Sequence, residues 1–364
     1  MDIHIVPGVK SKDVAEAHRL DLIHQQEYGC NCMTYWIDEE RETIFCLIEA
    51  PDKDAVKEMH RKAHGLVPNK VIEVSSSIVK SFLGRIYDPD DAVTDENGLK
   101  VFSDPSFRLL LVGKLNDHVL LKHRLGIDKA NDLLSKLNEI IRKNIRIHGG
   151  NEVEYAGDGF IVSFDSVAKS FSCALAIKED IPSADAEKLG LKMAINGGEP
   201  IEKSKELFGD AIRFANHLCA ISPASQIAIA SKAKELASKE LLQKKNDHFI
   251  SLSIPDEEII QQLFSRLEKK YNDPDFDIPE YSQGMAMSQT QLYRKTTSLT
   301  GVSCNVLLKD FRLEKGRELL KKQRHSISQV TFETGFTSPS YFTKCFKNKF
   351  GLLPNEYLDL LKTT

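Results

Sequence analysis

Histidine side chains gather in the first part of this chain at spacings that suit metal binding. Five of the eleven histidines lie within the first 64 residues, namely His4, His18, His24, His60 and His64. His60 and His64 are four residues apart in a segment expected to be helical, so both rings project from one face and can bind one ion. His18 and Asp21, three residues apart on another expected helix, share a face in the same way.

A cysteine adds a softer ligand to this candidate site. Cys46 lies in an expected strand between the two helices and contributes if its side chain faces them. Imidazole with a carboxylate or a thiolate suits Ni(II), Cu(II) or Zn(II), and the affinity order alone does not choose among these ions. The alternative is that these are surface and packing residues of a small sheet domain. The expected ligands of a divalent transition metal are His18, Asp21, Cys46, His60 and His64.

The elements that must position these ligands follow the order β-α-β-β-α-β, which is the ferredoxin-like arrangement. Both helices of that fold pack on one side of the sheet, so the two pairs can converge. The runs EAHRLD (16–21), YWIDE (35–39), IFCLIEAP (44–51) and MHRKAHGL (59–66) resemble a family of small nickel-binding ferredoxin-like domains, over essentially all of residues 1–75. The resemblance implies metal binding and often self-association. The expected strands are 2–6, 32–37, 43–50 and 71–75, and the expected helices are 11–28 and 52–64.

A second chemical feature is an aspartate in a glycine-rich turn between two expected strands. The run YAGDGFIVSF (155–164), which contains Asp158, resembles the central hairpin of class III nucleotide cyclases, and the likeness covers roughly residues 107–235. Those enzymes need two carboxylates to hold two metal ions, and Asp158 fits one of them. Other catalytic positions fall on unsuitable residues. These are Gly113 or Lys114 for the second carboxylate, Arg213 and His217 for the transition-state pair, and Glu154 for the base-reading lysine.

These substitutions remove most of the electrostatic stabilisation that the cyclase reaction depends on. We therefore expect a catalytically inactive domain that binds a nucleotide or another small ligand, or serves only for dimerisation. The alternative for Asp158 is a plain turn residue between strands.

Polar and basic residues near the end of the chain lie on helix faces suited to DNA. Ser288 and Ser338 are expected to cap two helices, Pro339 fits a first helical position, and Gly335 supplies the freedom of a tight turn. A shorter apolar helix precedes each of them, and a long helix, 305–322, joins the two pairs. This pattern predicts two helix-turn-helix units in tandem.

The second helix of each unit is expected to turn its polar face toward the major groove. In the C-terminal unit, Phe332, Tyr341, Phe342, Phe346 and Phe350 are expected on buried faces. The candidates for base and phosphate contacts are Gln289, Gln291, Arg294, Lys295, Ser338, Ser340, Lys344 and Lys347.

Charge supports DNA binding independently. Residues 279–364 hold thirteen Lys/Arg and seven Asp/Glu, which gives +6, whereas the whole chain carries −4, so the preceding part carries −10. The runs MSQTQLYRK (287–295), SYF (340–342) and PNEY (354–357) resemble the AraC/XylS-type DNA-binding domain over roughly residues 262–362, with Gln283-Gly284 as a mild departure. The resemblance implies two recognition helices in successive major-groove segments. The plainer alternative is a small helical bundle with a solvated basic surface.

We therefore expect a multidomain α+β chain. It comprises a ferredoxin-like metal-binding domain (1–78), a linker (79–106), a cyclase-like α/β sandwich (107–255) and an all-α tandem helix-turn-helix domain (256–364). No apolar run is long enough to cross a bilayer, the first residues show no signal pattern, and seven scattered cysteines favour a reducing compartment, so we expect a cytoplasmic protein.

The function expected from these parts is an AraC-type transcription regulator that is not an enzyme. It would bind double-stranded DNA as a homodimer joined through its N-terminal domains, under the control of a nickel-like metal or of a small-molecule or nucleotide ligand. The alternative function is an active class III nucleotide cyclase fused to a DNA-binding domain.

Overall fold

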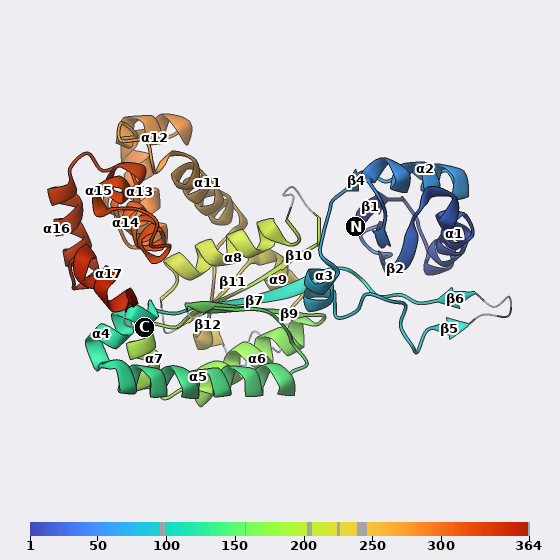
Figure 1. Cartoon of the computed structure of the whole chain (residues 1–364), viewed down its shortest axis with the longest axis horizontal. Helices are drawn as coiled ribbons and strands as arrows, with labels where there is room; N and C mark the ends of the chain where they lie inside the picture. Colours follow the sequence, from blue (N-terminus) through green and yellow to red (C-terminus); the bar gives the residue numbers. More distant parts are fainter. Residues whose placement is uncertain are drawn as a thin grey trace.

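The computed structural model describes residues 1–94, 96, 99–156, 158–201, 206–223, 226–238 and 246–362. Three bodies follow one another along the longest axis, with the N-terminal unit at one end and an all-helical unit at the other (Figure 1). The predicted fold class is confirmed: a ferredoxin-like unit, a central sheet with helices on both faces, and a helical C-terminal unit. No described helix is long and apolar enough to cross a membrane.

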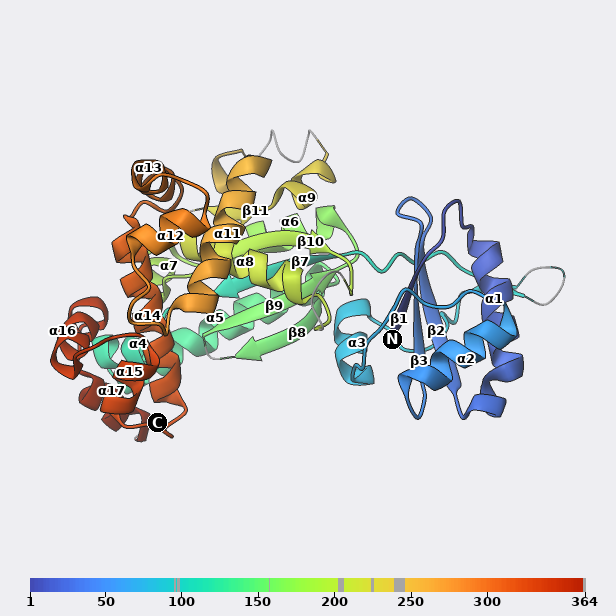
Figure 2. The ribbon, with the colours of Figure 1, turned by 90° about the horizontal axis from the view of Figure 1, so that it is seen from above.

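The N-terminal unit has the predicted β-α-β-β-α-β order. Its strands form one antiparallel sheet in the order β2-β3-β1-β4, and α1 and α2 cover the same face of it (Figure 2). Gly29 ends the first helical segment in a left-handed conformation, and the Asp52 carboxylate caps α2. The elements are β1 (Asp2–Ile5), α1 (Ser11–His24), a 3-10 turn (Gln25–Tyr28), β2 (Asn31–Asp38), β3 (Thr43–Glu49), α2 (Lys53–Ala63) and β4 (Lys70–Val71).

The segment 79–106, expected as a linker, contains regular structure. Helix α3 (Ser76–Leu83) runs into it, and β5 (Val93–Thr94) pairs with β6 (Lys100–Val101) as a hairpin. Val79 and Phe82 of α3 are buried because they pack in one core with the N-terminal sheet and the central domain. The segment therefore joins its neighbours through packed side chains.

The central domain is a six-stranded sheet in the order β12-β11-β10-β7-β9-β8. Helices α5 and α6 lie on one face and α8 on the other (Figure 1). The close pairing of β7 with β9 requires Gly159, since an added Cβ would lie 2.5 Å from the Gly113 carbonyl oxygen. The elements are β7 (Arg108–Lys114), α4 (His118–Leu125), α5 (Ile127–Ile147), β8 (Asn151–Ala156), β9 (Gly159–Phe164), α6 (Val167–Asp180), α7 (Ser183–Leu189), β10 (Lys192–Gly198), α8 (Gly209–Ile221), β11 (Ile227–Ile229), α9 (Ser231–Glu235), a 3-10 turn (Asn246–His248) and β12 (Phe249–Ser251).

The C-terminal unit has the predicted tandem pattern. The Ser288 and Ser338 hydroxyls accept from the backbone of the third residue of their helices, and Gly335 holds its turn at φ 75°. Ala286 adopts the corresponding left-handed conformation, at φ 53°, in the first unit. The helices are α11 (Ile254–Lys270), α12 (Ile278–Gly284), α13 (Gln289–Thr300), α14 (Cys304–Lys321), α15 (Ile327–Glu333), α16 (Pro339–Phe350) and α17 (Pro354–Lys362).

Two aromatic residues expected to be buried in the C-terminal unit lie at the surface. Phe332 and Tyr341 are 55% and 54% exposed, so that prediction was wrong for both. Phe342 and Phe346 of α16 fill the core under this helix, together with Val330 of α15, Leu313 of α14 and Tyr357 of α17. The helical spacing therefore overestimated how many aromatic side chains of α15 and α16 are buried.

Two apolar cores cross the predicted domain borders. The outer face of the N-terminal sheet, with Phe45 and Leu47, packs in one cluster with Phe82 and Phe208 of the following segments. A second cluster unites Phe214 of α8 with residues of α11 to α14. The three bodies therefore share close-packed side chains at both borders.

Candidate metal site and DNA-binding surface

His60 lies at the centre of a buried polar cluster between β1, α1 and α2. Its Nε2 is 3.0 Å from Asp2 Oδ2, and its Nδ1 is 3.1 Å from Asp21 Oδ1. His64 Nε2 lies 3.0 Å from His60 Nδ1 and 3.1 Å from Asp21 Oδ1. The structure thus brings Asp21, His60 and His64 together, with three donor atoms that face one another.

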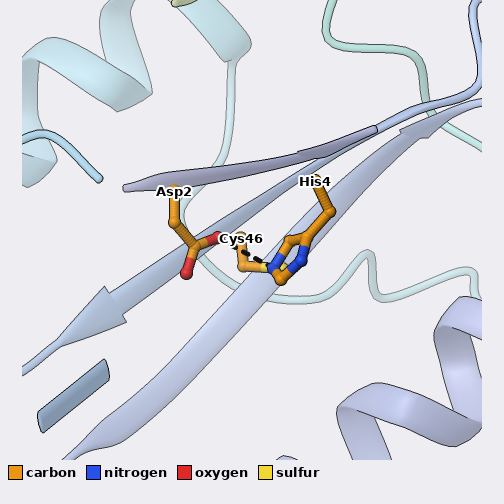
Figure 3. A group of neighbouring side chains, drawn as sticks. All are labelled: Asp2, His4 and Cys46. Atoms are coloured by element: carbon orange, nitrogen blue, oxygen red, sulfur yellow. Dashed lines mark ion pairs between the residues drawn. The ribbon is translucent and has the colours of Figure 1, made fainter. Parts of the chain in front are cut away.

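A second group lies on the sheet, under the helices. Asp2 and Cys46 are opposite each other across β1 and β3, and His4 shares their face, with its Nε2 3.6 Å from Asp2 Oδ1 (Figure 3). All three are buried, and they form a second set of metal-binding types. Asp2 and His4 were not among the expected ligands. Their spacing in a strand, i and i+2, was the available signal, because it puts two polar side chains on the same face.

His18 lies apart from both groups. Its Nε2 is 3.9 Å from Asp88 Oδ1, and its ring packs against Tyr35. It nevertheless lines a cavity that Asp21, His60 and His64 of the first group and His4 and Cys46 of the second also line. The volume of this cavity is about 20 Å³, enough for one water molecule or one ion. The five expected ligands therefore surround one small cavity, with Cys46 and His18 outside the Asp21, His60 and His64 group.

The charges in this cluster are strongly coupled. Burial opposes the charge of His60, but its hydrogen bonds to Asp2 and Asp21 outweigh burial and raise the pKa of His60 to about 9. Burial also opposes the ionisation of Asp21, yet His60 and His64 hold the pKa of Asp21 below its usual value. Burial raises the pKa of the Cys46 thiol far above its usual range. Metal binding here must therefore displace protons.

His64 links the cluster to the loop after α2. The Leu66 backbone N–H donates to His64 Nδ1 at 3.2 Å, so a neutral ring carries its proton on Nε2, facing Asp21. Coordination of a metal through Nε2 requires that proton on Nδ1 instead. A metal held by His64 Nε2 would therefore leave His64 Nδ1 unable to accept from the Leu66 N–H.

The donor set fits a divalent transition metal. Ligand atoms on an ion with bonds of about 2.0–2.1 Å lie about 2.9 Å apart at right angles and about 3.3 Å apart in a tetrahedron. The separations of 3.0–3.1 Å among Asp21, His60 and His64 fall in that range. Asp2 Oδ1 is buried and has no hydrogen-bond partner among the described residues, which suits a nearby cation. Asp2 Oδ2 also accepts from His60 Nε2, the outer partner that metal-binding imidazoles need.

Asp158, the residue that the cyclase resemblance gives as a metal carboxylate, is paired with a cation of this chain. Asp158 Oδ1 lies 3.1 Å from His118 Nδ1, and its Oδ2 pairs with Lys321 of α14. At the positions of the transition-state pair, Arg213 lies 3.7 Å from Asp210, and His217 Nε2 lies 2.9 Å from Glu268 of α11. The helical unit thus contacts Asp158 and His217, two of the positions that the cyclase resemblance assigns to catalysis.

The second helix of each helix-turn-helix unit has an accessible polar face. Two polar residues on these faces, Gln289 and Ser340, are exposed. Three cations, Arg294, Lys344 and Lys347, are exposed as well, and none of the three forms an ion pair within the described part of the chain. α13 and α16 thus offer cations and hydrogen-bonding groups to a partner of opposite charge.

Three of the expected DNA-contacting residues also have partners within the helical unit. The Gln291 side chain accepts from the Ser288 backbone at 2.9 Å as part of a capping box, and Ser338 caps α16. Lys295 Nζ lies 3.1 Å from Asp256 Oδ1 of α11. The sequence analysis could not separate these roles, because capping and groove-facing residues are of the same types.

Two segments of the chain match known families. Residues 1–74 match the family described as nickel responsive protein SCO4226-like. Residues 281–359 match the family described as helix-turn-helix domain. These segments contain the buried polar cluster and most of the two helix-turn-helix units, respectively.

Curated relatives are similar to parts of the chain. A histidine kinase P4 from Formosa agariphila is 33% identical over 30% of this chain and 8% of its own length. The HTH-type transcriptional regulator MtrA from Neisseria gonorrhoeae is 32% identical over 27% of this chain and 31% of its own. A putative adenylate cyclase 3 from Rhizobium meliloti is 25% identical over 28% of this chain and 18% of its own. The chain spans less than a third of the length of each.

The resemblances to a nickel-binding ferredoxin-like family and to a helix-turn-helix family are confirmed, and that to the nucleotide cyclases has weaker support from one relative. The chain therefore carries a segment of the nickel-responsive family at one end and a helix-turn-helix segment at the other.

Proposed function

We propose that this chain is a sequence-specific, DNA-binding transcription regulator of the AraC type, controlled by a divalent transition metal such as nickel at its N-terminal domain. The single observation that carries the proposal is the pair of capped helices, α13 and α16, with their accessible cations. One helical domain then offers two groove-reading surfaces to the same DNA. A helix-turn-helix family match over these helices supports the same function. Cytoplasmic residence is part of the proposal.

The roles within the DNA-binding surface follow from exposure and partners. Arg294, Lys344 and Lys347 are the proposed phosphate or guanine contacts, since their charges are unpaired in the described part of the chain. Gln289 and Ser340 are proposed to reach base edges or phosphate. We propose that three other polar residues contribute less to DNA binding, because each already has a partner within the helical unit; these are Gln291, Lys295 and Ser338.

The proposed metal ligands are Asp21, His60 and His64, with Asp2 as the outer partner of His60. A second group of metal-binding side chains lies on the adjacent sheet surface and consists of Asp2, His4 and Cys46. We propose that these side chains shift when the ion binds. A bound ion supplies positive charge that replaces the protons now shared among these side chains. Cys46 and His18 line the cavity without contacting the three proposed ligands closely, so we propose that they shape the site.

A contact path supports control of the DNA-binding unit by the metal site. Cys46 is on one face of β3, and its neighbour Phe45, on the opposite face, packs in one core with Phe208. Phe208 precedes α8, and His217 of α8 contacts Glu268 of α11, the first helix of the helical unit. We propose that metal binding favours one arrangement of this path over another, which changes DNA affinity.

A groove of about 530 Å³ between α8 and α11 is the proposed seat of a small ligand. This volume is in the range of small-molecule sites. Arg213, Arg266 and Lys269 line it, together with His217, whose buried Nδ1 has no partner among the described residues. An anionic metabolite or nucleotide bound there would contact the central domain and the helical unit at once.

The central domain is proposed to be inactive as a cyclase. Lys321 neutralises Asp158, and Lys114 ends the strand where a second carboxylate is needed. Incubation of the purified protein with ATP or GTP and Mn²⁺ is expected to give no cyclic nucleotide; clear product would favour the cyclase alternative.

Affinity selection from random duplex DNA, with and without Ni²⁺, tests the proposed function. We expect an enriched motif with two half-elements, one for each recognition helix. Its recovery should depend on Ni²⁺. The absence of any enriched motif under either condition would reject sequence-specific binding. Gel filtration across a protein concentration series tests the proposed homodimer separately.

A further inference from the structure

Two carboxylates of the central domain pair with the helix that joins the helix-turn-helix units. Asp117 is 2% exposed, and its Oδ2 lies 2.6 Å from Lys321 Nζ and accepts from the Tyr357 hydroxyl at 2.9 Å. It also pairs with Arg317. Asp158 Oδ2 pairs with the same Lys321 and lies 4.0 Å from Arg317. Arg317 is paired in addition with Glu314 of its own helix, at 3.0 Å. Two acids of the central domain and two cations of α14 thus form one ion-pair cluster.

The cluster is shielded from solvent and supported by apolar packing. The side chains of Arg317 and Lys321 are only 15% and 22% exposed. Beside them, Val119 of α4 is fully buried in the core of the C-terminal helix-turn-helix unit, a core that includes Leu313 and Leu320. Shielded pairs of this kind are screened by salt less than surface pairs are. The contact is therefore a specific docking surface between the two domains.

Both acids remain charged at neutral pH. Burial opposes the ionisation of Asp158, but His118 and Lys321 outweigh burial and hold its pKa below the usual range. Burial likewise opposes the ionisation of Asp117, and Arg317 with Lys321 keeps its pKa low. The ion pairs persist wherever the protein is handled near neutrality.

Docking leaves the recognition helices accessible, since Arg294 and Lys344 are exposed in the docked arrangement. The central domain therefore acts on the DNA-binding unit in another way. Arg317 and Lys321 are two of the thirteen cations of residues 279–364, and they cannot contact phosphate while paired. The first helix-turn-helix unit is held to the central domain through α11, and the second through Val119 and the ion cluster.

We propose that Asp117 and Asp158 form an intramolecular latch that lowers DNA affinity by holding Arg317 and Lys321 and by fixing the C-terminal helix-turn-helix unit on the central domain. The latch rests on the proposed DNA-binding function and adds a regulatory contact to it. Opening the latch frees Lys321 and lets the second unit adjust to the groove, while Arg317 keeps its ion pair with Glu314 of its own helix. Each cation that gains a phosphate contact steepens the dependence of log K on log salt by about 0.9.

The test uses the full chain with Asp117→Asn and Asp158→Asn combined. Asparagine preserves the cap of α4, in which Asp117 Oδ1 accepts from the Val119 backbone at 2.9 Å. The charge-matched control combines Asp165→Asn and Asp180→Asn, whose carboxylates pair with Lys169 and Lys143 on the surface of the central domain. Hydrogen exchange in α4 and α17 reports docking. Binding to a fluorescein-labelled duplex of random sequence, over a salt series, reports DNA affinity.

We expect the latch variant to show faster exchange in α4 and α17, tighter DNA binding at low salt, and a salt slope steeper by about 0.9, for the one cation that is freed. The control should match the wild type in all three.

Unchanged exchange in the latch variant would overturn the docking role. Faster exchange with equal or weaker DNA binding would overturn the inhibitory role. If none of these proteins binds any duplex at low salt, the DNA-binding function itself fails, and the latch fails with it.

Discussion

Arg294 and Lys344 occupy equivalent positions on the two recognition helices. Each is the sixth residue after the serine that caps its helix, Ser288 for α13 and Ser338 for α16, and each is exposed. The two helix-turn-helix units thus present a cation at the same place relative to their own turns. Two equivalent cations on one domain suit two successive approaches to the same DNA backbone or base edge.

Replacement of either cation should weaken DNA binding to a similar extent. Arg294→Ala and Lys344→Ala are each expected to reduce affinity and to make the salt slope shallower by about 0.9, because one contact to phosphate is lost. Lys136→Ala, an exposed lysine of α5 in the central domain, is the matched control. Fluorescence anisotropy over a salt series gives both quantities. Wild-type binding by both variants would show that these helices do not face DNA.

Lys295 should matter less than its neighbour Arg294. Its ammonium is 3.1 Å from the Asp256 carboxylate, so it already has a partner on α11. Lys295→Ala is expected to reduce DNA affinity less than Arg294→Ala does in the same assay. An equal or larger loss would mean that Lys295 leaves Asp256 and joins the DNA contact.

The turn of the first helix-turn-helix unit can be stabilised by glycine. Ala286 holds φ 53° where the second unit has Gly335 at φ 75°. The left-handed conformation costs an alanine about 1 kcal/mol, and glycine avoids this cost. Glycine also increases the conformational entropy of the unfolded chain, which offsets part of the gain in stability. Ala286→Gly is therefore expected to raise the free energy of unfolding by up to about 1 kcal/mol. Urea unfolding measures it, and a lower midpoint would contradict this account of the turn.

His64 is expected to be required for tight metal binding. His64→Ala removes one donor of the Asp21, His60 and His64 group and should lower Ni²⁺ affinity by at least about tenfold, as measured by isothermal titration calorimetry. His24→Ala is the control, because His24 pairs with Glu27 near the end of α1 and does not line the cavity. Equal Ni²⁺ affinities in the two variants would place the metal elsewhere.

Local patterns made most of the fold predictable. The cap serines, the turn glycine and the order of strands and helices are decided by residues close in sequence, and the structure has them where expected. The exposure of Phe332 and Tyr341 was not predictable in this way. Spacing gives the face of a helix on which a residue lies, but it does not give the width of the core beneath that face.

The contacts between distant segments could not be predicted. Asp2 meets His60 across 58 residues, and Asp158 meets Lys321 across 163, so no local spacing records either pair. The periodicity of α2 put His60 and His64 on one face, and only the packing of β1 beneath α2 adds Asp2 to them. Asp158 was expected as a metal carboxylate or a turn residue; its partner is a lysine of the DNA-binding unit.

The dependence of DNA binding on Ni²⁺ tests the central claim most directly. The wild type and a His60→Asn, His64→Asn double variant would be titrated onto the selected DNA with Ni²⁺ and with a chelator. The account predicts that Ni²⁺ changes the wild-type affinity by about fivefold or more and leaves the double variant, which still binds DNA, unchanged. Equal wild-type affinities with Ni²⁺ and with chelator would contradict metal control, and a wild type that binds no DNA would contradict the regulator itself.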